Sequence, residues 1–250
     1  MQRFVRSKWA KTVALRRNPT LSKYIPETRK LTEENLRQWL RRYKTVYVKP
    51  FYGTWGKGVI RIDRLDYGYR FQTGTVPRNF PYFSILYAHL RSVVKSKPYL
   101  VQQGIDLLKY NGRRFDLRVM VQKTPWRTWE ATGIIGRVAH PRKIVTNFHN
   151  GGQLKALSTL MRSYMNAAEL ARFRLRLKRL GLRTALQLER RYPGIKEIGV
   201  DVAVDGNLKP WILEVNTNPD PTIFKYLKNK RIYAKIRRYD LYYKRKTRKR

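Results

Sequence analysis

The chain has 250 residues, 42% of them hydrophobic, and its 56 lysines and arginines against 16 acids give a formal charge of +40. This length can bury one substantial core or two small lobes that share one, and no apolar run approaches the ~20 residues of a membrane span. Without cysteine and with three scattered histidines, the chain excludes disulfides, thiolate or histidine-based metal sites and a cysteine nucleophile. The charge predicts a polyanion or an acidic substrate as a partner, without deciding which.

The first half of the chain predicts a basic helix and an extended arm, followed by strands and helices in alternation. Residues 1–30 are basic and contain two prolines, and Thr32 is the expected N-cap of the next helix. A break is predicted from Pro77 to Pro81, and a helix over 82–95. The expected strands cover residues 45–48, 59–62, 67–72 and 99–103.

The second half predicts more strands, a long helical region and a hairpin. Helical periodicity runs over 154–191 with an interruption near Gly181, and Asp205-Gly206 is a strong hairpin signal. Residues 225–250 hold 13 basic residues and one acid, so they are either a tail or a terminal basic helix. The expected strands cover residues 117–122, 129–138, 197–204 and 209–216.

Three polar residues of the predicted hairpin suggest a metal site. Asp201 alternates with valines in the first strand, and Glu214 and Asn216 alternate with apolar residues in the second. If the connecting loop has an even number of residues, the three project to one side, and diagonal neighbours lie roughly 7–8 Å apart. That spacing suits one or two hard cations such as Mg²⁺. A half-buried hairpin with a solvated polar face is the alternative, which Asp201 alone would favour.

A second motif places Lys49 at the end of a strand and three glycines, Gly53, Gly56 and Gly58, in the turn that follows. Glycines permit positive φ and a close approach of the backbone to phosphates, and Lys57 adds a cation to the amides that could cradle an anion. The spacing matches neither a Walker A loop nor the glycine loop of protein kinases. Taken alone, a tight hairpin with structural glycines is an equal alternative.

Three further segments are ambiguous when each is considered alone. One is a strand that ends in Gln103, Gly104 and Ile105. Another places Asp116 and Arg118 on one face of a strand, where the arginine either offers its planar fork to phosphate or forms an ordinary cross-strand ion pair. The third is a polar loop over 146–152 that contains Asn147 and ends in two glycines.

In this order, the five segments resemble the ATP-grasp superfamily, and in detail its YheC/YheD-type endospore-coat-associated branch. The resemblance covers about residues 24–221. Its most specific parts are Val-Lys-Pro with Gly-Lys-Gly, Gln-Gln-Gly-Ile with Phe-Asp-Leu-Arg-Val, Thr-Asn with Gly-Gly, and Gly-Val-Asp with Leu-Glu-Val-Asn-Thr-Asn-Pro. It implies an α+β fold in which two α+β subdomains clasp a nucleotide.

The resemblance also implies a division of the chain into four parts. A basic arm and helix would cover 1–45, and a small subdomain with the glycine-rich loop would cover 46–106. A large subdomain with the metal site would cover 107–224, and a basic C-terminal segment would follow over 225–250. Only about 45 residues precede Lys49, so most of a substrate-binding domain would be missing or supplied by a partner.

The implied cofactors are ATP and Mg²⁺. Lys57 and Arg118 would act in catalysis by facing the phosphates, and the hinge departs from the commoner Gln-Glu pattern because Gln103 replaces the acid. The metal would be held by Asp201, Glu214 and Asn216. The nucleotide would be bound by Lys49, Gly53, Gly56, Lys57, Gly58, Gln103, Gly104, Ile105, Asp116 and Asn147.

The implied activity is that of an ATP-dependent carboxylate–amine ligase, in which ATP phosphorylates a carboxylate substrate to give ADP and an acyl-phosphate, and an amine acceptor then attacks the acyl-phosphate. An alternative is a spore-associated structural or polyanion-binding protein that keeps the fold and holds an acidic polymer. A purely nucleic-acid-binding protein is a third reading, weakened by the absence of a recognised nucleic-acid motif. We expect a cytoplasmic protein, with spore association implied by the resemblance alone.

Overall fold

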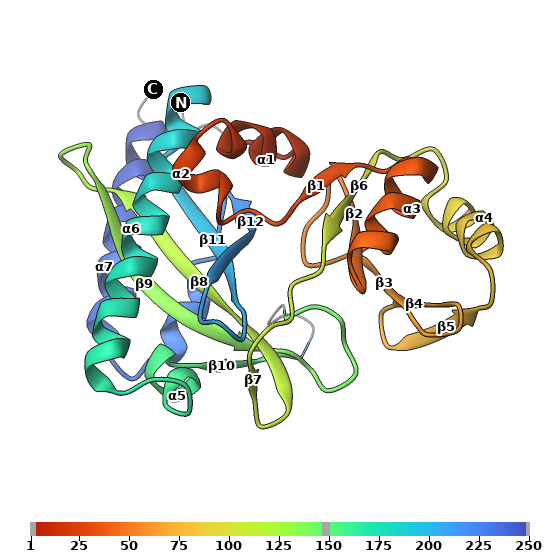
Figure 1. Ribbon diagram of the computed structural model, residues 1–250. Helices are drawn as coiled ribbons and strands as arrows, with labels where there is room; N and C mark the ends of the chain where they lie inside the picture. Colours follow the sequence, from red (N-terminus) through yellow and green to blue (C-terminus); the bar gives the residue numbers. More distant parts are fainter. Residues whose placement is uncertain (1–3, 147–150, 249–250) are drawn as a thin grey trace.

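The computed structural model describes residues 4–146 and 151–248, which form two antiparallel sheets with helices packed on them. Figure 1 shows the two sheets side by side, with helix α1 (Lys8–Arg16) above β12 (Pro210–Asn216) near their junction. The predicted α+β fold class is confirmed. Among the described helices, none is both long enough and apolar enough to cross a membrane.

The first sheet has the strand order β1-β6-β2-β3-β4-β5. Helices α3 (Glu33–Arg42) and α4 (Phe83–Val94) pack on it and close a small separate core. Helix α3 begins at the predicted N-cap, where the Thr32 hydroxyl accepts a hydrogen bond from Asn35 N. The strands are β1 (Thr28–Lys30), β2 (Thr45–Pro50), β3 (Ile60–Arg64), β4 (Tyr69–Thr73), β5 (Val76–Phe80) and β6 (Tyr99–Gln103).

The second sheet has the order β10-β9-β8-β11-β12, with the short strand β7 paired to β8. Its core is the larger one and includes residues of α1 and α6. The remaining strands are β7 (Lys109–Tyr110), β8 (Arg113–Lys123), β9 (Trp129–Val138), β10 (Gln153–Lys155) and β11 (Glu197–Val204). The helices are α2 (Pro19–Ser22), α5 (Leu157–Met161), α6 (Ala167–Arg191), the 3₁₀ helix η2 (Thr222–Tyr226) and α7 (Lys230–Arg248).

Strand β8 shows how both faces of the second sheet are used. Val119 belongs to the core beneath α6, whereas Met120 on the opposite face packs with Ile236 of α7. Asp116 and Arg118 share the face of Met120 because side chains alternate along a strand. They lie beyond the part of the face that Met120 fills, and they line a cavity. On this face of the sheet, one end therefore packs against α7 and the other end lines the cavity.

Helix α6 corrects one prediction, because it continues through Gly181 to Arg191 without interruption. The break in the helical region falls earlier, between α5 and α6. A Cβ on Gly181 would lie 2.8 Å from Val121 Cγ2 and 3.0 Å from Val119 Cγ1. The glycine therefore serves the close approach of α6 to β8, and its low helix propensity is overridden by packing.

The predicted break from Pro77 to Pro81 is also wrong in part, since β5 spans Val76–Phe80. Proline lacks the amide hydrogen that a central strand needs, but it is tolerated at the edge of a sheet. Strand β5 is such an edge, because it pairs only with β4 within the described residues.

The last segment is a helix, as one of the two sequence alternatives proposed. Helix α7 buries Ile236 and Tyr239 completely or nearly so, and Ile236 packs with Phe224 and Ile135. Two tyrosine hydroxyls of α7, those of Tyr239 and Tyr243, donate to acceptors on the second sheet and its β8–β9 turn. These contacts make α7 an integral part of the second sheet's packing.

Candidate functional site

A cavity of about 210 Å³ lies between the two sheets. The first sheet contributes the end of β2, the loop to β3 and the end of β6, and the second contributes β8, β9, β11 and β12. Of the predicted site residues, the cavity brings together Lys49, Gly53, Gly56, Lys57, Gln103, Ile105, Asp116, Arg118, Asp201, Glu214 and Asn216. Asn147 lies outside the described residues, and Gly58 and Gly104 do not line the cavity.

Lys49 supplies a buried cation to the first wall. It ends β2, and its Nζ donates to Gln102 Oε1 over 2.6 Å. Burial lowers the pKa of Lys49 to about 8, although Glu214 acts in the opposite direction. Lys49 Nζ also lies 5.7 Å from the centre of the Tyr47 ring, and no ion pair with a carboxylate is found for it among the described residues. A lysine in such surroundings is well suited to meet an incoming anion.

The glycine-rich loop forms the rest of this wall. Gly53 and Gly56 have φ values of 134° and 72°, in the region that glycine adopts readily. Gly58 has φ 73°, and a Cβ there would lie 3.0 Å from the Tyr99 hydroxyl, so this glycine shapes the base of the loop. Lys57 lines the cavity and is exposed. The loop can therefore bring backbone amides and the Lys57 ammonium, which lies 5.7 Å from the centre of the Trp55 ring, to the cavity.

The end of β6 provides an apolar patch and a close turn. Ile105 is buried and lines the cavity, whereas Gly104 N donates to Thr45 O and a Cβ there would lie 2.6 Å from that oxygen. Gln103 lines the cavity as well, but its side-chain oxygen accepts from Glu27 N over 3.2 Å. Gly104 is thus needed for packing against β2, and Ile105 offers the apolar surface.

Four buried charged residues form a network on the second wall. Asp116 lies opposite Arg137, and Asp201 lies opposite Arg118, in the registers of β8 with β9 and β11. Arg118 Nε donates to Asp201 Oδ1 over 2.5 Å, and Arg137 Nε donates to Asp116 Oδ1 over 2.8 Å. Arg137 Nη2 also lies 3.0 Å from Asp201 Oδ2 and joins the two pairs. Arg118 is therefore oriented by Asp201 across the sheet, and not by its strand neighbour Asp116.

The network shifts the pKa values of two of its members, Asp201 and Arg137. Burial alone would raise the pKa of Asp201, but Arg118 and Arg137 hold this pKa down at about 2. Burial acts to lower the pKa of Arg137, yet Asp116 and Asp201 raise it overall. Asp201 and Arg137 are therefore charged at neutral pH, and both line the cavity.

The hairpin brings Asp201 and Glu214 opposite one another by a device the sequence did not reveal. Five residues separate β11 from β12, an odd number that by itself would place Asp201 out of step with Glu214. A β-bulge after Asp201 shifts the register and restores the pairing of Asp201 with Glu214. Asn216 pairs with Gly199, two residues further along. The three polar side chains consequently reach the same cavity.

The donor set of this group fits a hard cation in chemistry, because it contains only carboxylate and amide oxygens. Internal cations now hold both carboxylates: Lys8 Nζ lies 2.6 Å from Glu214 Oε1, and the two arginines hold both oxygens of Asp201. Among the described residues, no cluster of three acids, histidines or cysteines has metal-site geometry. Glu214 and Asn216 fit as ligands directly, whereas Asp201 would have to exchange an arginine for the metal.

Two basic residues that line the cavity, Lys8 and Arg137, were missed by the sequence prediction. Lys8 reaches Glu214 from 206 positions earlier in the chain, and no local pattern signals such a contact. Arg137 carries a detectable signal, because a lone charge interrupts the otherwise apolar and small residues of 131–138. A buried charge of that kind requires a partner, which turns out to be Asp116.

The chain is similar to a known protein family and to curated proteins over most of its length. Residues 1–246 match the family model described as YheC/D like ATP-grasp. The chain is 29% identical over 230 residues to the endospore coat-associated protein YheD of Bacillus subtilis (strain 168), covering 88% of this chain and 49% of that protein. It is 20% identical over 217 residues to YheC, the endospore coat-associated protein of the same organism, covering 85% and 59% respectively. The chain thus spans about half the length of the curated relatives it matches.

A solved structure shares the fold. The D-cycloserine synthetase DcsG superposes with a TM-score of 0.55 at 12% sequence identity, covering 91% of this chain and 67% of that one. At this identity the likeness shows the fold alone.

Proposed function

The chain belongs to the YheC/D-like ATP-grasp family, and we propose that it binds Mg-ATP in the cavity between its sheets and uses it as a carboxylate–amine ligase. The observation that carries the proposal is the opposition of two walls across one cavity. The first wall offers Lys49, the glycine-rich loop and an apolar patch, and the second offers arginine and carboxylate oxygens. Lys49, the loop amides and the arginines are complementary to a triphosphate, and the apolar patch is complementary to a base. The carboxylate oxygens are complementary to a divalent cation.

The proposed roles follow from position. Ile105 would pack on the base near Gln103 and Gly104, Lys49 would contact the α-phosphate, and the loop from Gly53 to Gly58 would cover the β- and γ-phosphates. Asn147, in the loop outside the described residues, would contribute on the ribose or phosphate side. Asp116 would act on the nucleotide through Arg137, which it holds in place.

Glu214 and Asn216 would hold Mg²⁺, with Asp201 as a third ligand once Arg118 turns from it toward the phosphates. A cation held there would supply positive charge that offsets the charge of the phosphates. Lys57 and Arg118 would stabilise the charge that grows on the γ-phosphoryl group as it passes to the carboxylate. An amine would then attack the acyl-phosphate and release phosphate, so that the products are an amide, ADP and phosphate.

Hydroxylamine trapping tests the ligase function. Because hydroxylamine attacks acyl-phosphates, the protein with ATP and the right acid should yield a hydroxamate and an equal amount of ADP. Lys57→Ala should lower turnover more than ATP affinity, since Lys57 acts mainly on charge that develops during transfer. Formation of AMP and pyrophosphate would reject this mechanism. A broad panel of amino acids, peptides and acidic polymers that gives no ADP, while Mg-ATP binds tightly, would reject the ligase.

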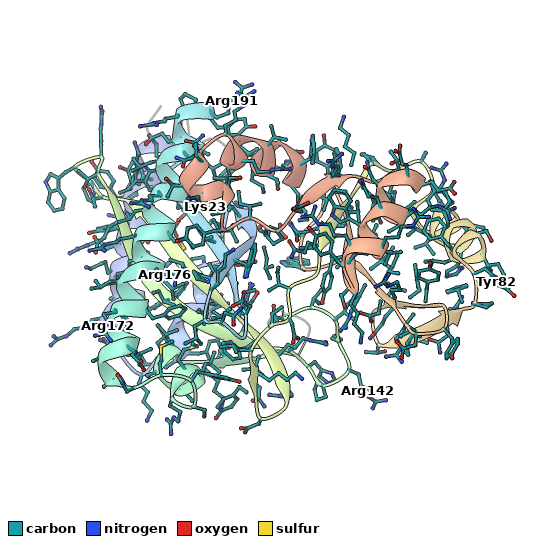
Figure 2. All side chains as sticks on the ribbon, in the orientation of Figure 1. Lys23, Tyr82, Arg142, Arg172, Arg176 and Arg191 are labelled. Carbon is teal, nitrogen blue, oxygen red and sulfur yellow. The ribbon has the colours of Figure 1, made fainter. Side chains whose placement is uncertain are left out.

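That second outcome would favour a spore-associated binding protein that keeps the ATP-grasp fold. The observation behind this alternative is the basic outer surface. Arg172, Arg176 and Arg191 are exposed on α6 and project outward in Figure 2. Such a surface attracts polyanions by releasing their counterions. The names of the curated relatives agree with spore association, which for this chain is part of the proposal.

A further inference from the structure

Lys8 occupies a position that local rules disfavour. It is the first residue of α1, its side chain is only 9% exposed, and the first turn of the helix contains no acid. The helix dipole disfavours a cation at this end, and burial of an ammonium is costly unless it is paired. Sites that break local rules in this way are commonly functional or strained. The contacts of Lys8 indicate which function it serves.

The ammonium of Lys8 joins the two walls of the cavity. Lys8 Nζ donates to Glu214 Oε1 over 2.6 Å on the second sheet and to Gly53 O over 2.8 Å in the glycine-rich loop of the first. The main chain adds to this junction, because Lys8 N donates to Phe51 O over 2.8 Å. The ring of Trp9 stacks on that of Phe51, with centroids 6.0 Å apart.

Helix α1 does not depend on this lysine for its attachment to the second sheet. Ala14 and Leu15 are buried in the large core. Gln187 Nε2 donates to Ala14 O over 2.9 Å, and the Tyr192 hydroxyl donates to Ala10 O over 3.3 Å. Contacts other than the ion pair of Lys8 therefore hold the helix on the second sheet. The two groups that accept hydrogen bonds from the Lys8 ammonium, Glu214 Oε1 and Gly53 O, both belong to the proposed nucleotide site.

We propose that Lys8 is a positioning residue of this site, whose ammonium stands in for a divalent cation on Glu214 and tethers the glycine-rich loop to it. This inference rests on the proposed function. The oxygen that accepts from Lys8 at 2.6 Å is one that a metal would use, so the two cations compete for Glu214 Oε1. Metal binding at Glu214 displaces the ammonium, and the same event releases Gly53. Occupation of the metal site is thereby coupled to freedom of the loop.

The test compares three variants with the parent protein. Lys8→Met removes the ammonium, Lys8→Arg keeps a cation within reach of Glu214, and Lys11→Met is the matched control. Lys11 is also buried, three residues after Lys8 on α1, and it lines a second, smaller cavity together with Lys8 and Glu214. Burial lowers the pKa of Lys11 and the charge of Glu214 opposes this effect, but no hydrogen bond or ion pair of the Lys11 side chain is found among the described residues. Two quantities are measured without nucleotide: Mn²⁺ affinity, from the signal of free Mn²⁺ in electron paramagnetic resonance, and hydrogen exchange of amides 53–58.

We expect Lys8→Met to bind Mn²⁺ roughly tenfold more tightly, in line with the loss of a charged hydrogen bond that competes for the ligand. Its loop amides should exchange faster, and Mn²⁺ should accelerate exchange in the parent. Lys8→Arg should stay close to the parent. Lys11→Met should change Mn²⁺ affinity less than threefold, because it removes a similar long-range charge without the direct contact.

Glu214→Gln provides a second route if Lys8→Met does not fold. It also breaks the ion pair, so it should speed loop exchange, and the double variant should add nothing further. Equal Mn²⁺ affinity in folded Lys8→Met and the parent, or equal changes in Lys8→Met and Lys11→Met, would overturn the inference. The proposed function fails separately, if the parent binds no Mg-ATP; tight Mg-ATP binding with unaffected loop exchange in every variant rejects only the role of Lys8.

Discussion

The two walls of the cavity are built in opposite ways. On the second sheet, Asp116, Arg118, Arg137 and Asp201 are each at most 7% exposed and bind one another across three adjacent strands. On the first sheet, the wall is mainly a loop of glycines with Lys57 exposed at its surface. One wall is therefore held by buried ion pairs across the sheet, and the other consists mainly of loop backbone. In the proposed function, such a division would suit a site that orients a triphosphate and also admits it.

The largest expected effect comes from a substitution that breaks the buried ion-pair network of the second sheet. Arg137→Leu leaves Asp116 buried without its main partner, which should lower the free energy of unfolding by about 3–5 kcal/mol. The exposed control is Arg42→Ala at the end of α3, which removes an ion pair to Glu27 whose side chains are 61% and 40% exposed. That change should cost less than about 1 kcal/mol. Chemical denaturation measures both, and similar losses would contradict the buried network's role in holding the second wall.

A second prediction concerns the packing that supports the second wall. Gly181→Ala places a methyl group against Val119 and Val121 of β8, and should destabilise the protein by about 1–3 kcal/mol despite the better helix propensity of alanine. Gly206→Ala is the control, because nothing lies within 4 Å of the added Cβ. Thermal unfolding compares them. A neutral Gly181→Ala would mean that α6 does not need its close approach to the sheet.

The smallest effect concerns pH and the first wall. Since the pKa of Lys49 is lowered to about 8, the free protein loses this positive charge as the pH rises through 8, and ATP affinity should fall several-fold between pH 7.5 and 9. Lys11, whose pKa is also lowered to about 8, shares the surroundings, so Lys11→Met should keep the slope and Lys49→Arg should flatten it. Stability should change in the opposite sense. The unfolded chain binds the Lys49 proton more tightly, so stability rises from pH 8 toward 10.5.

Titration calorimetry of ATP at several pH values checks the binding part of this prediction. A slope that survives in Lys49→Arg and disappears in Lys11→Met would assign the titration to the wrong lysine.

Much of the fold was accessible from sequence because local signals and periodicity agree there. The Thr32 cap, strand β9 and the hairpin strands all follow from patterns within a few residues. The errors arose where contacts between residues that are distant in the sequence determine the local structure. Gly181 looks like a helix breaker until β8 is placed beneath it, and Pro77 looks like a strand breaker until β5 is known to be an edge.

The sequence motifs predicted many of the residues that line the cavity, but not how these residues contact one another. Motif residues from both sheets do meet in one cavity. The pairing of Arg118 with Asp201 depends on strand register, and the pairing of Glu214 with Asp201 depends on a bulge, neither of which can be read from one strand alone. Lys8 is the extreme case, because its contact spans 206 positions. The residue roles assigned by resemblance remain predictions.

The most direct test of the central claim is a calorimetric titration of ATP into the protein, with and without Mg²⁺. The two-walled site predicts one ATP per chain, affinity that depends on Mg²⁺, and at least roughly tenfold weaker Mg-ATP binding in Glu214→Gln, which keeps the side chain's shape but removes the charge a hard cation needs. Asp201→Asn should weaken it as well, with the fold intact by circular dichroism. Mg-ATP binding as tight in both variants as in the parent, or none in the folded parent, would contradict the account.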